Sequence, residues 1–303
     1  MRKKILICGG TGLVGNRLIE LMDFDRYEVY ILTRTKKAPT ENIQYFEWDF
    51  SNMEIEKGAT NVDYIINLTG AGIADKRWTA ERKKILIDSR VNSLKLIKKG
   101  IDQDGSMPDA LVSASAVGYY GDREGKELRE TSSPGKGFMS ECCELWEKAA
   151  LEIESYFDRL SIARIGIVLS TKGGALPKIL MTKSIGVYNY FGNGDQYYSW
   201  VHIDDLCKML IVMTENQTMS GIYNCVSPQP LTNKDFTIKI KDALGGMITL
   251  PAPKFGLRLA LGEMADVVLN SNNVIPQRFL EANYDYKYSE IGPAVKALVQ
   301  QKN

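Results

Sequence analysis

The stretch from Lys3 to Met22 limits what this 303-residue chain can fold into more than any other part of it. It begins with a short apolar run, 5–8, of the length of a buried strand. A helical pattern of apolar residues ends the stretch. Between the two lies a cluster of glycines: Gly9, Gly10, Gly12 and Gly15. Strand, glycine turn and helix in this order are typical of a dinucleotide-binding fold.

Each of three glycines in this turn has its own physical reason. Gly9 permits the tight turn, Gly12 lets the backbone approach a pyrophosphate, and Gly15 lets the helix lie close to the strand. The first N–H groups of the helix are unpaired and carry partial positive charge, so a phosphate binds well there. The sequence therefore predicts a dinucleotide site. The alternative is a glycine-rich turn that serves only to pack the helix on the strand.

The residue after the second predicted strand indicates which dinucleotide binds. The run 28–33 is typical of a buried strand, and Arg34 follows it. An acidic residue near this position binds the ribose 2′-hydroxyl of NAD, whereas an arginine suits the 2′-phosphate of NADP. A planar guanidinium can bind that phosphate through two hydrogen bonds. We therefore predict NADP(H) as the cofactor, and the alternative is an exposed basic turn.

The order of the remaining elements predicts the fold class. Further strands are expected at 43–50, 62–68, 110–116 and 160–169, and helices at 79–100 and 138–156. Alternating strands and helices predict an α/β fold, a Rossmann-type doubly wound parallel sheet with right-handed crossovers. From Ser170 the alternation weakens, which indicates a smaller C-terminal α/β lobe. We expect an NADP-binding Rossmann domain over residues 1–169, to which 201–226 returns, and a substrate-binding lobe over 170–303.

The carboxyl ends of the predicted strands carry the candidate cofactor contacts. Small residues at such an end let a cofactor lie over the backbone. The residues expected to line the cofactor are Gly9, Thr11, Gly12, Leu13, Val14, Gly15, Thr33, Arg34, Asp49, Phe50, Leu68, Thr69, Gly70 and Ala71. The lysines and arginines of the helix at 79–100 are interpreted as a solvated face, with Arg90 and Asn92 as candidate exceptions.

Composition narrows the class of protein. Lys plus Arg (38) nearly balances Asp plus Glu (37), so we expect neither a nucleic-acid partner nor a membrane-surface partner. No signal-peptide pattern is found, and no uncharged apolar run reaches the roughly 18 residues of a membrane span. Five cysteines without a CxxC pair predict a reduced, cytoplasmic protein. The single histidine, His202, excludes a His-rich metal site, and we expect no metal. A small-molecule substrate is expected, and oligomerisation stays open.

Several pieces of the chain resemble the extended short-chain dehydrogenase/reductase superfamily of nucleotide-sugar epimerases and dehydratases. They are the glycine turn, Asp49, 68–71, 115–121 and 200–206. Within that superfamily the chain is most similar to the atypical "epimerase family protein" group. The C-terminal domain of unknown function of that group (DUF1731 type) resembles residues 251–299. The resemblance implies an NADP-binding protein related to epimerases and oxidoreductases.

The resemblance also implies a catalytic set, which this chain keeps only in part. The superfamily uses a Ser or Thr that orients the substrate, and a Tyr and a Lys spaced YxxxK. The Tyr exchanges a proton with the substrate, and the Lys and the nicotinamide ribose lower its pKa. Ser115 falls at the Ser position, but Met139 and Cys143 stand where the Tyr and the Lys are expected. A thioether carries no proton and a thiol supplies no fixed positive charge, so the usual chemistry is not expected.

Other side chains are candidates for the missing proton donor. Ser115, Tyr119 and Tyr120 are the catalytic candidates, and Glu141 is a further carboxylate in the same helix. The alternative is that both tyrosines pack or contact substrate and that Glu141 is a surface charge. His202 is expected to be a hydrogen-bonded structural residue.

Two functions remain open at this point. The first is an NADP(H)-binding epimerase- or oxidoreductase-like protein acting on an unknown polar, nucleotide-sugar-like substrate. The second is a non-catalytic NADP(H)-binding module that binds a partner.

Overall fold

Eight strands form the large sheet, in the order β14-β8-β6-β5-β1-β2-β3-β4. Their bounds are β1 (Lys3–Cys8), β2 (Tyr27–Thr33), β3 (Ile43–Asp49), β4 (Glu54–Ile55), β5 (Tyr64–Asn67), β6 (Ala110–Ala116), β8 (Arg159–Ile165) and β14 (Gly221–Cys225). Every neighbouring pair is parallel except β3 and β4. The computed structural model, which describes residues 1–300, therefore confirms the α/β fold with a doubly wound parallel sheet.

The order of the strands reverses beside β1. The chain runs outward from β1 through β2 to β3, then returns to β5 on the other side and continues through β6 to β8. In an open α/β sheet this reversal point, between β1 and β5, is where ligands bind, beyond the carboxyl ends of the strands.

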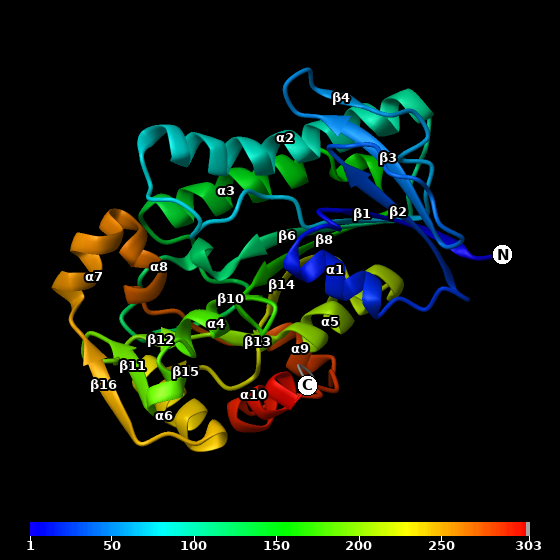
Figure 1. Ribbon diagram of the computed structural model, residues 1–303. Helices are drawn as coiled ribbons and strands as arrows, with labels where there is room; N and C mark the ends of the chain where they lie inside the picture. Colours follow the sequence, from blue (N-terminus) through cyan, green and yellow to red (C-terminus); the bar gives the residue numbers. More distant parts are fainter. Residues whose placement is uncertain (301–303) are drawn as a thin grey trace.

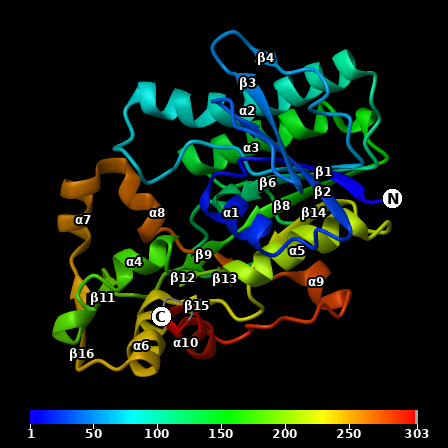
Figure 2. The same cartoon turned by 45° about the vertical axis from the view of Figure 1, so that its right-hand side comes forward.

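Helices cover both faces of the sheet (Figures 1 and 2). One face is covered by α2 (Ala80–Asp104) and α3 (Phe138–Leu151), and the other by α1 (Leu13–Glu20) and α5 (Ile203–Glu215). Thr79 caps α2 by accepting a hydrogen bond from the Arg82 N–H at 3.1 Å. Within residues 1–300, no helix has both the length and the apolar character needed to cross a membrane.

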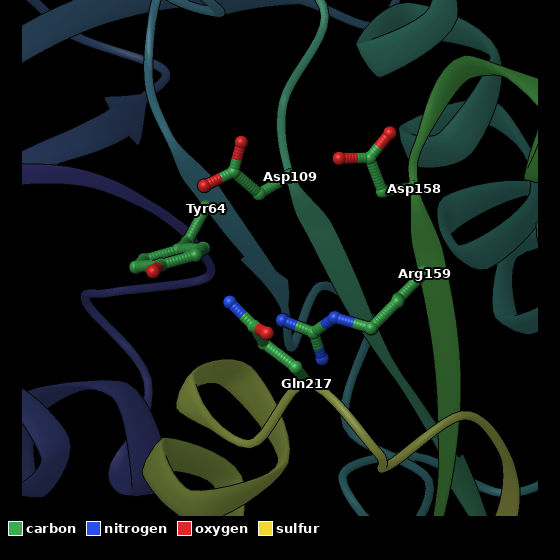
Figure 3. A pocket seen from close by; sticks show the side chains of 5 residues that line it. All are labelled: Tyr64, Asp109, Asp158, Arg159 and Gln217. Atoms are coloured by element: carbon green, nitrogen blue, oxygen red, sulfur yellow. The ribbon is translucent and has the colours of Figure 1, made fainter.

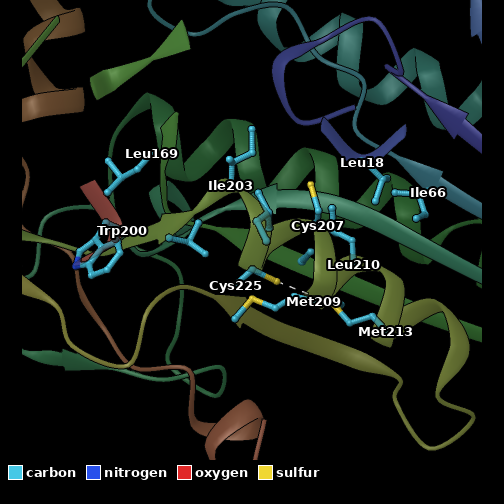
Figure 4. Packing of buried hydrophobic residues seen from close by; sticks show 14 of the residues in the cluster. Leu18, Ile66, Leu169, Trp200, Ile203, Cys207, Met209, Leu210, Met213 and Cys225 are labelled. Carbon is cyan, nitrogen blue, oxygen red and sulfur yellow. Dashed lines mark hydrogen bonds between the residues drawn. The ribbon is translucent and has the colours of Figure 1, made fainter. Parts of the chain in front are cut away.

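Two apolar cores hold these layers together. One lies between the sheet and the helix pair α2 and α3. The other begins under α1 and α5, where Leu18, Cys207 and Met213 pack together (Figure 4). It continues without a break to Phe236 and Val295 in the lobe. Because the sheet and the lobe share this core, the lobe is held firmly beside the carboxyl ends of the strands.

The lobe is made of helices, a three-stranded sheet and short strand pairs (Figure 1). Its strands, with one strand contributed by the loop before α3, are β7 (Glu127–Leu128), β9 (Ile167–Ser170), β10 (Gly173–Gly174), β11 (Val187–Phe191), β12 (Tyr197–Tyr198), β13 (Trp200–His202), β15 (Leu231–Thr232), β16 (Ile248–Ala252) and β17 (Asn273–Val274). Its helices are α4 (Ala175–Ile179), α6 (Asn233–Leu244), α7 (Lys254–Leu261), α8 (Asp266–Leu269), α9 (Gln277–Glu281) and α10 (Ile291–Gln300). Short 3₁₀ turns are η1 (Val117–Tyr120), η2 (Glu154–Tyr156), η3 (Lys183–Ile185) and η4 (Gly262–Ala265).

The single strand expected at 160–169 is in fact two strands, β8 and β9, which belong to different sheets. The break is at Gly166, where a Cβ atom would lie 2.4 Å from the carbonyl oxygen of Ser199. The next residue, Ile167, donates its N–H to the same oxygen at 2.8 Å. At this close backbone approach the chain leaves the eight-stranded sheet and enters the three-stranded sheet β10-β9-β13. Only a glycine allows the approach, because it has no Cβ atom.

Candidate cofactor and active site

The glycine turn after β1 has the geometry of a dinucleotide-binding loop. Gly9 has a φ of +82°, which L side chains rarely adopt. A Cβ atom on Gly15 would lie 2.3 Å from the Gly9 oxygen and 2.6 Å from the Gly10 Cα, so the helix could not approach the strand. Gly12 differs, because its φ of −81° suits any residue. Within the described residues, a Cβ atom there would meet only the Gly9 oxygen, at 3.3 Å. The fold therefore requires glycine at Gly9 and Gly15, whereas a Cβ atom on Gly12 would need only a small shift of its neighbour.

The start of α1 fits a phosphate group. Gly12 is the N-cap residue, and none of the side chains at 1–300 caps the helix. The first N–H groups are therefore open to an anion, which a helix N-terminus attracts. A cleft of about 750 Å³ begins at Thr11 and runs along α1, past Arg17 and Glu20, where residues 170–173 of the lobe line it. The turn can thus hold the pyrophosphate of a dinucleotide.

The end of β2 presents a free cation. Arg34 is exposed, and no carboxylate of the described chain pairs with it. The Thr33 hydroxyl donates to the Thr35 carbonyl at 2.6 Å. At the end of β3, the Asp49 carboxylate accepts the Ser51 N–H at 2.7 Å and so caps a local turn. Phe50, the next residue, packs edge-on against Trp48, so both predicted cofactor residues at the end of β3 have local contacts.

The residues that follow β5 lie at the carboxyl ends of the strands, as the glycine turn does. Cys8 of β1 pairs with Asn67 of β5, so the glycine turn and residues 68–71 lie next to each other. The Thr69 hydroxyl oxygen is buried and has no hydrogen-bond partner among residues 1–300. Leaving such a group unpaired costs free energy, so a ligand hydrogen bond would stabilise it. The structure thus brings all the predicted cofactor residues to the carboxyl ends of β1, β2, β3 and β5.

Ser115, at the carboxyl end of β6, lies in a buried polar network. Its hydroxyl donates to the carboxylate of Glu147 on α3, with 2.6 Å from Oγ to Oε1. Glu147 also forms a two-point ion pair with Arg164 of β8, at 2.8 Å for each N···O pair. The two charged side chains are only 7% and 1% exposed. Because the Ser115 proton is held by Glu147, the free lone pairs of Ser115 can only accept a hydrogen bond.

The two candidate tyrosines have different environments. Tyr120 is fully buried, donates to Asn224 Oδ1 at 2.6 Å and accepts from Arg164 Nη1 at 3.0 Å. Burial raises the pKa of Tyr120 to about 12. Tyr119 is only partly buried. Arg164 is near enough to interact with its hydroxyl, and no acceptor in the described part of the chain takes the hydroxyl proton of Tyr119. Its ring centroid lies 3.4 Å from the Arg164 guanidinium carbon. Burial raises the pKa of Tyr119, and the nearby Arg164 charge opposes that effect. Of the two hydroxyls, only that of Tyr119 is available to a ligand.

Glu147 and Arg164 were not among the predicted site residues. The signal in the sequence was an arginine within an apolar run, since a charged side chain in a buried strand needs a partner. Its partner lies 17 residues earlier on another element, so no spacing rule could find it.

The first turns of α3 carry no acid at the positions of the missing pair. Met139 packs over Gly118, and Glu141 is exposed. Cys143 is buried, and burial raises the pKa of its thiol to about 12, so it stays neutral.

His202 is fully buried at the start of α5, where its Nδ1 accepts the Asp204 N–H at 3.1 Å.

A second depression lies on the side of the sheet where the strands begin (Figure 3). It is lined by Tyr64, Asp109, Asp158, Arg159 and Gln217, which lie near the amino ends of β5, β6 and β8. Arg159 donates to the carbonyls of Thr214 and Asn216 at 2.9 Å and so binds the end of α5. This depression is distant from the glycine turn and has a structural explanation.

Comparison with known proteins places the chain among epimerase relatives. Residues 5–139 match the NAD dependent epimerase/dehydratase family, and residues 252–298 match a domain of unknown function, DUF1731. An epimerase family protein of Staphylococcus aureus (strain NCTC 8325 / PS 47) is 33% identical over 301 residues, which is 99% of this chain and 100% of the relative. The epimerase family protein YfhF of Bacillus subtilis (strain 168) is 31% identical, over 98% of each chain.

Solved structures of epimerase relatives have the same fold as this chain. The human epimerase family protein SDR39U1 (isoform 2), solved with NADPH, superposes with a TM-score of 0.86 at 29% identity, covering 98% of this chain and 99% of that one. A nucleoside-diphosphate sugar epimerase from Corynebacterium glutamicum superposes with a TM-score of 0.76 at 27% identity, covering 97% of this chain and 57% of that one.

Proposed function

This chain belongs to the NAD-dependent epimerase/dehydratase family, and from that premise we propose that it binds NADP(H) and acts as an epimerase or oxidoreductase on a polar, nucleotide-sugar-like substrate. The observation that carries the proposal is the unpaired, exposed Arg34 at the end of β2, next to a glycine turn that can hold a pyrophosphate. The human relative solved with NADPH supports the choice of NADP(H).

The bound cofactor would supply or take up a hydride at this edge of the sheet. A carbonyl that gains a hydride also needs a proton, from a donor within about 3 Å of the oxygen. Tyr119 is the candidate for that donor, because its hydroxyl proton has no acceptor within the described structure. Arg164 lies against its ring and would stabilise the negative charge that develops on the phenol oxygen. Ser115 would accept a hydrogen bond from the substrate, and Tyr120 would hold Arg164 in place.

The test of cofactor choice is a calorimetric titration with NADPH and NADH. The wild-type protein should bind NADPH more tightly, and Arg34→Ala should weaken NADPH binding by roughly tenfold to a hundredfold. NADH lacks the 2′-phosphate, so its affinity should be the same in both proteins, which makes it an internal control. Equal NADPH affinity in the two proteins would remove the role assigned to Arg34.

The test of catalysis is NADPH consumption against panels of carbonyl compounds and nucleotide sugars. Tyr119→Phe should lower a detected rate by ~10²–10⁴-fold, the usual contribution of general acid–base catalysis. Ser115→Ala removes only a hydrogen-bond acceptor and should lower the rate less. Tyr120→Phe should have a smaller effect, because its hydroxyl contacts Asn224 and Arg164 rather than the open edge. Sugar-nucleotide epimerisation that none of the three substitutions changes would place the active site elsewhere.

A second candidate function is a non-catalytic NADP(H)-binding module that binds a partner. The specific observation in its favour is that Met139 and the neutral Cys143 thiol stand where α3 should supply an acid and a cation. NADPH binding without turnover on any panel would favour this function.

A further inference from the structure

Arg90 of α2 lies beneath the turn that follows β5. Its Nη1 donates to the carbonyls of Leu86 at 2.8 Å and Ala71 at 3.2 Å. A Cβ atom on Gly70 would lie 2.9 Å from the guanidinium carbon and 3.1 Å from Nη2. The backbone of Gly70 is not in the left-handed region, so its conformation does not demand a glycine. The guanidinium group is the neighbour that leaves no room for a side chain at Gly70.

The guanidinium group brings a positive charge to the face of α3 where a cation is missing. Its carbon lies 4.9 Å from the ring centroid of Trp146. Burial lowers the pKa of Arg90. An arginine remains protonated at neutral pH even so. A fixed cation therefore lies over Trp146, three residues after Cys143 on α3, but it comes from α2.

Arg90 keeps donors for a ligand. Nε and Nη2 have no hydrogen-bond acceptor in the part of the chain that the structure describes, and the side chain is partly exposed. The position of Arg90 near the carboxyl end of β5 indicates which part of a dinucleotide it faces. Arg34 marks the 2′-phosphate end at β2, and the glycine turn marks the pyrophosphate at β1. The next strand beyond β1 is β5, so the nicotinamide half extends toward Gly70 and Arg90.

We propose that Arg90 binds the nicotinamide ribose of NADP(H) and supplies, from α2, the fixed positive charge that α3 lacks. The proposal rests on the proposed function, because it needs the dinucleotide to bind at this edge. Arg90 is then a cofactor-binding residue, and Gly70 is a glycine because any side chain would displace the guanidinium group.

The experiment compares a whole cofactor with half of one, in the full-length protein. NADPH and adenosine 2′,5′-bisphosphate, which lacks the nicotinamide half, are each titrated by calorimetry. Arg90→Ala should weaken NADPH binding by roughly tenfold to a hundredfold and leave the bisphosphate affinity unchanged. Arg34→Ala should weaken both ligands. Lys95→Ala removes an exposed lysine from the same helix and should change neither affinity.

A second variant keeps the charge but moves it. Gly70→Ala puts a methyl group against the guanidinium group and should reproduce the selective loss of NADPH affinity if Arg90→Ala proves unstable. Unchanged NADPH affinity in both variants would overturn the inference while the proposed function stands. An equal loss of both ligands would also overturn it, because Arg90 would then only support the turn. If the wild-type protein binds the bisphosphate but not NADPH, the inference fails. If it binds neither, the proposed function fails with it.

Discussion

At the scale of single residues, burial decides which side chains remain free to react. Tyr119 and Tyr120 are adjacent in the sequence, yet the hydroxyl of Tyr119 donates no hydrogen bond within the described residues and that of Tyr120 is held by Asn224 and Arg164. The same rule applies to ionisable groups that take no part in the proposed chemistry. His202 is fully buried, and its Nε2 has no partner among residues 1–300.

The burial of His202 predicts a dependence of stability on pH. Burial is the largest effect and lowers the pKa of His202 from its ordinary 6.5 to about 4. Between pH 6.5 and pH 4, His202 is protonated in the unfolded chain but not in the folded chain. The free energy of unfolding should therefore fall as the pH falls from 6.5 to 4. The loss should reach about 3 kcal/mol, and above pH 6.5 the group should have no effect. Denaturant unfolding measured at intervals between pH 7 and pH 4 checks this.

His202→Asn is the matched control for this prediction. The Asn side chain can still accept the Asp204 N–H at the start of α5, but it does not titrate. Its unfolding free energy should therefore fall less steeply over the same pH range. Identical slopes in the two proteins would assign the acid sensitivity to other groups.

At the scale of elements, the strand–turn–helix unit shows two different reasons for a glycine. Gly15 is required by packing, because a Cβ atom there would meet the backbone of Gly9 and Gly10. Gly12 has an ordinary backbone conformation, and a Cβ atom there would make one tight contact, 3.3 Å from the Gly9 oxygen, so packing demands a glycine less strongly here than at Gly15. A ligand that approaches the helix N-terminus closely would explain it.

This difference predicts opposite outcomes for two substitutions in one turn. Gly12→Val should abolish NADPH binding with little change in circular dichroism or melting temperature, because the side chain would occupy the place of the pyrophosphate. Gly15→Val should lower the melting temperature clearly, because helix and strand must move apart. Calorimetry and thermal melting of both variants check this. NADPH binding retained by Gly12→Val would mean that the turn only packs the helix.

At the scale of the whole molecule, the C-terminal segment is part of the shared core rather than an appendage. Phe279, Ile291 and Val295 are at most 2% exposed and belong to the core that reaches the large sheet. β17 pairs with β7, and β16 pairs with β11, so the segment is also bound by backbone hydrogen bonds at two points. The lobe was predicted to extend to residue 303, and residues 301–303 lie outside the described part of the chain.

The shared core predicts that removing the segment unfolds the protein. A chain ending at Leu250 should be insoluble or unstable, because it exposes the core surface that α9 and α10 cover. A point variant gives a milder test: Phe279→Ala should cost about 3–5 kcal/mol, as expected for a fully buried phenylalanine. Solubility, thermal melting and denaturant unfolding measure these effects. A soluble fragment that melts like the full chain would contradict the prediction.

The sequence by itself determined the features that depend on local order. The glycine turn, the alternation of strands and helices and the pieces 68–71, 115–121 and 200–206 were sufficient to predict the fold class and the family, and both predictions are confirmed. These features are readable because a turn, a strand period and a helix period each arise among neighbouring residues. The placing of the predicted cofactor residues along one sheet edge followed from the same order, because parallel strands end at the same side.

Only the tertiary structure decided which side chains meet. Ser115, Glu147 and Arg164 come from β6, α3 and β8, and Arg90 reaches Gly70 from α2. No pattern within any one of these elements indicates such a contact, because it depends on how helices pack across a sheet. The physical cause is burial: a charge enclosed by the fold must find a partner there, and the packed layers determine which partner is within reach.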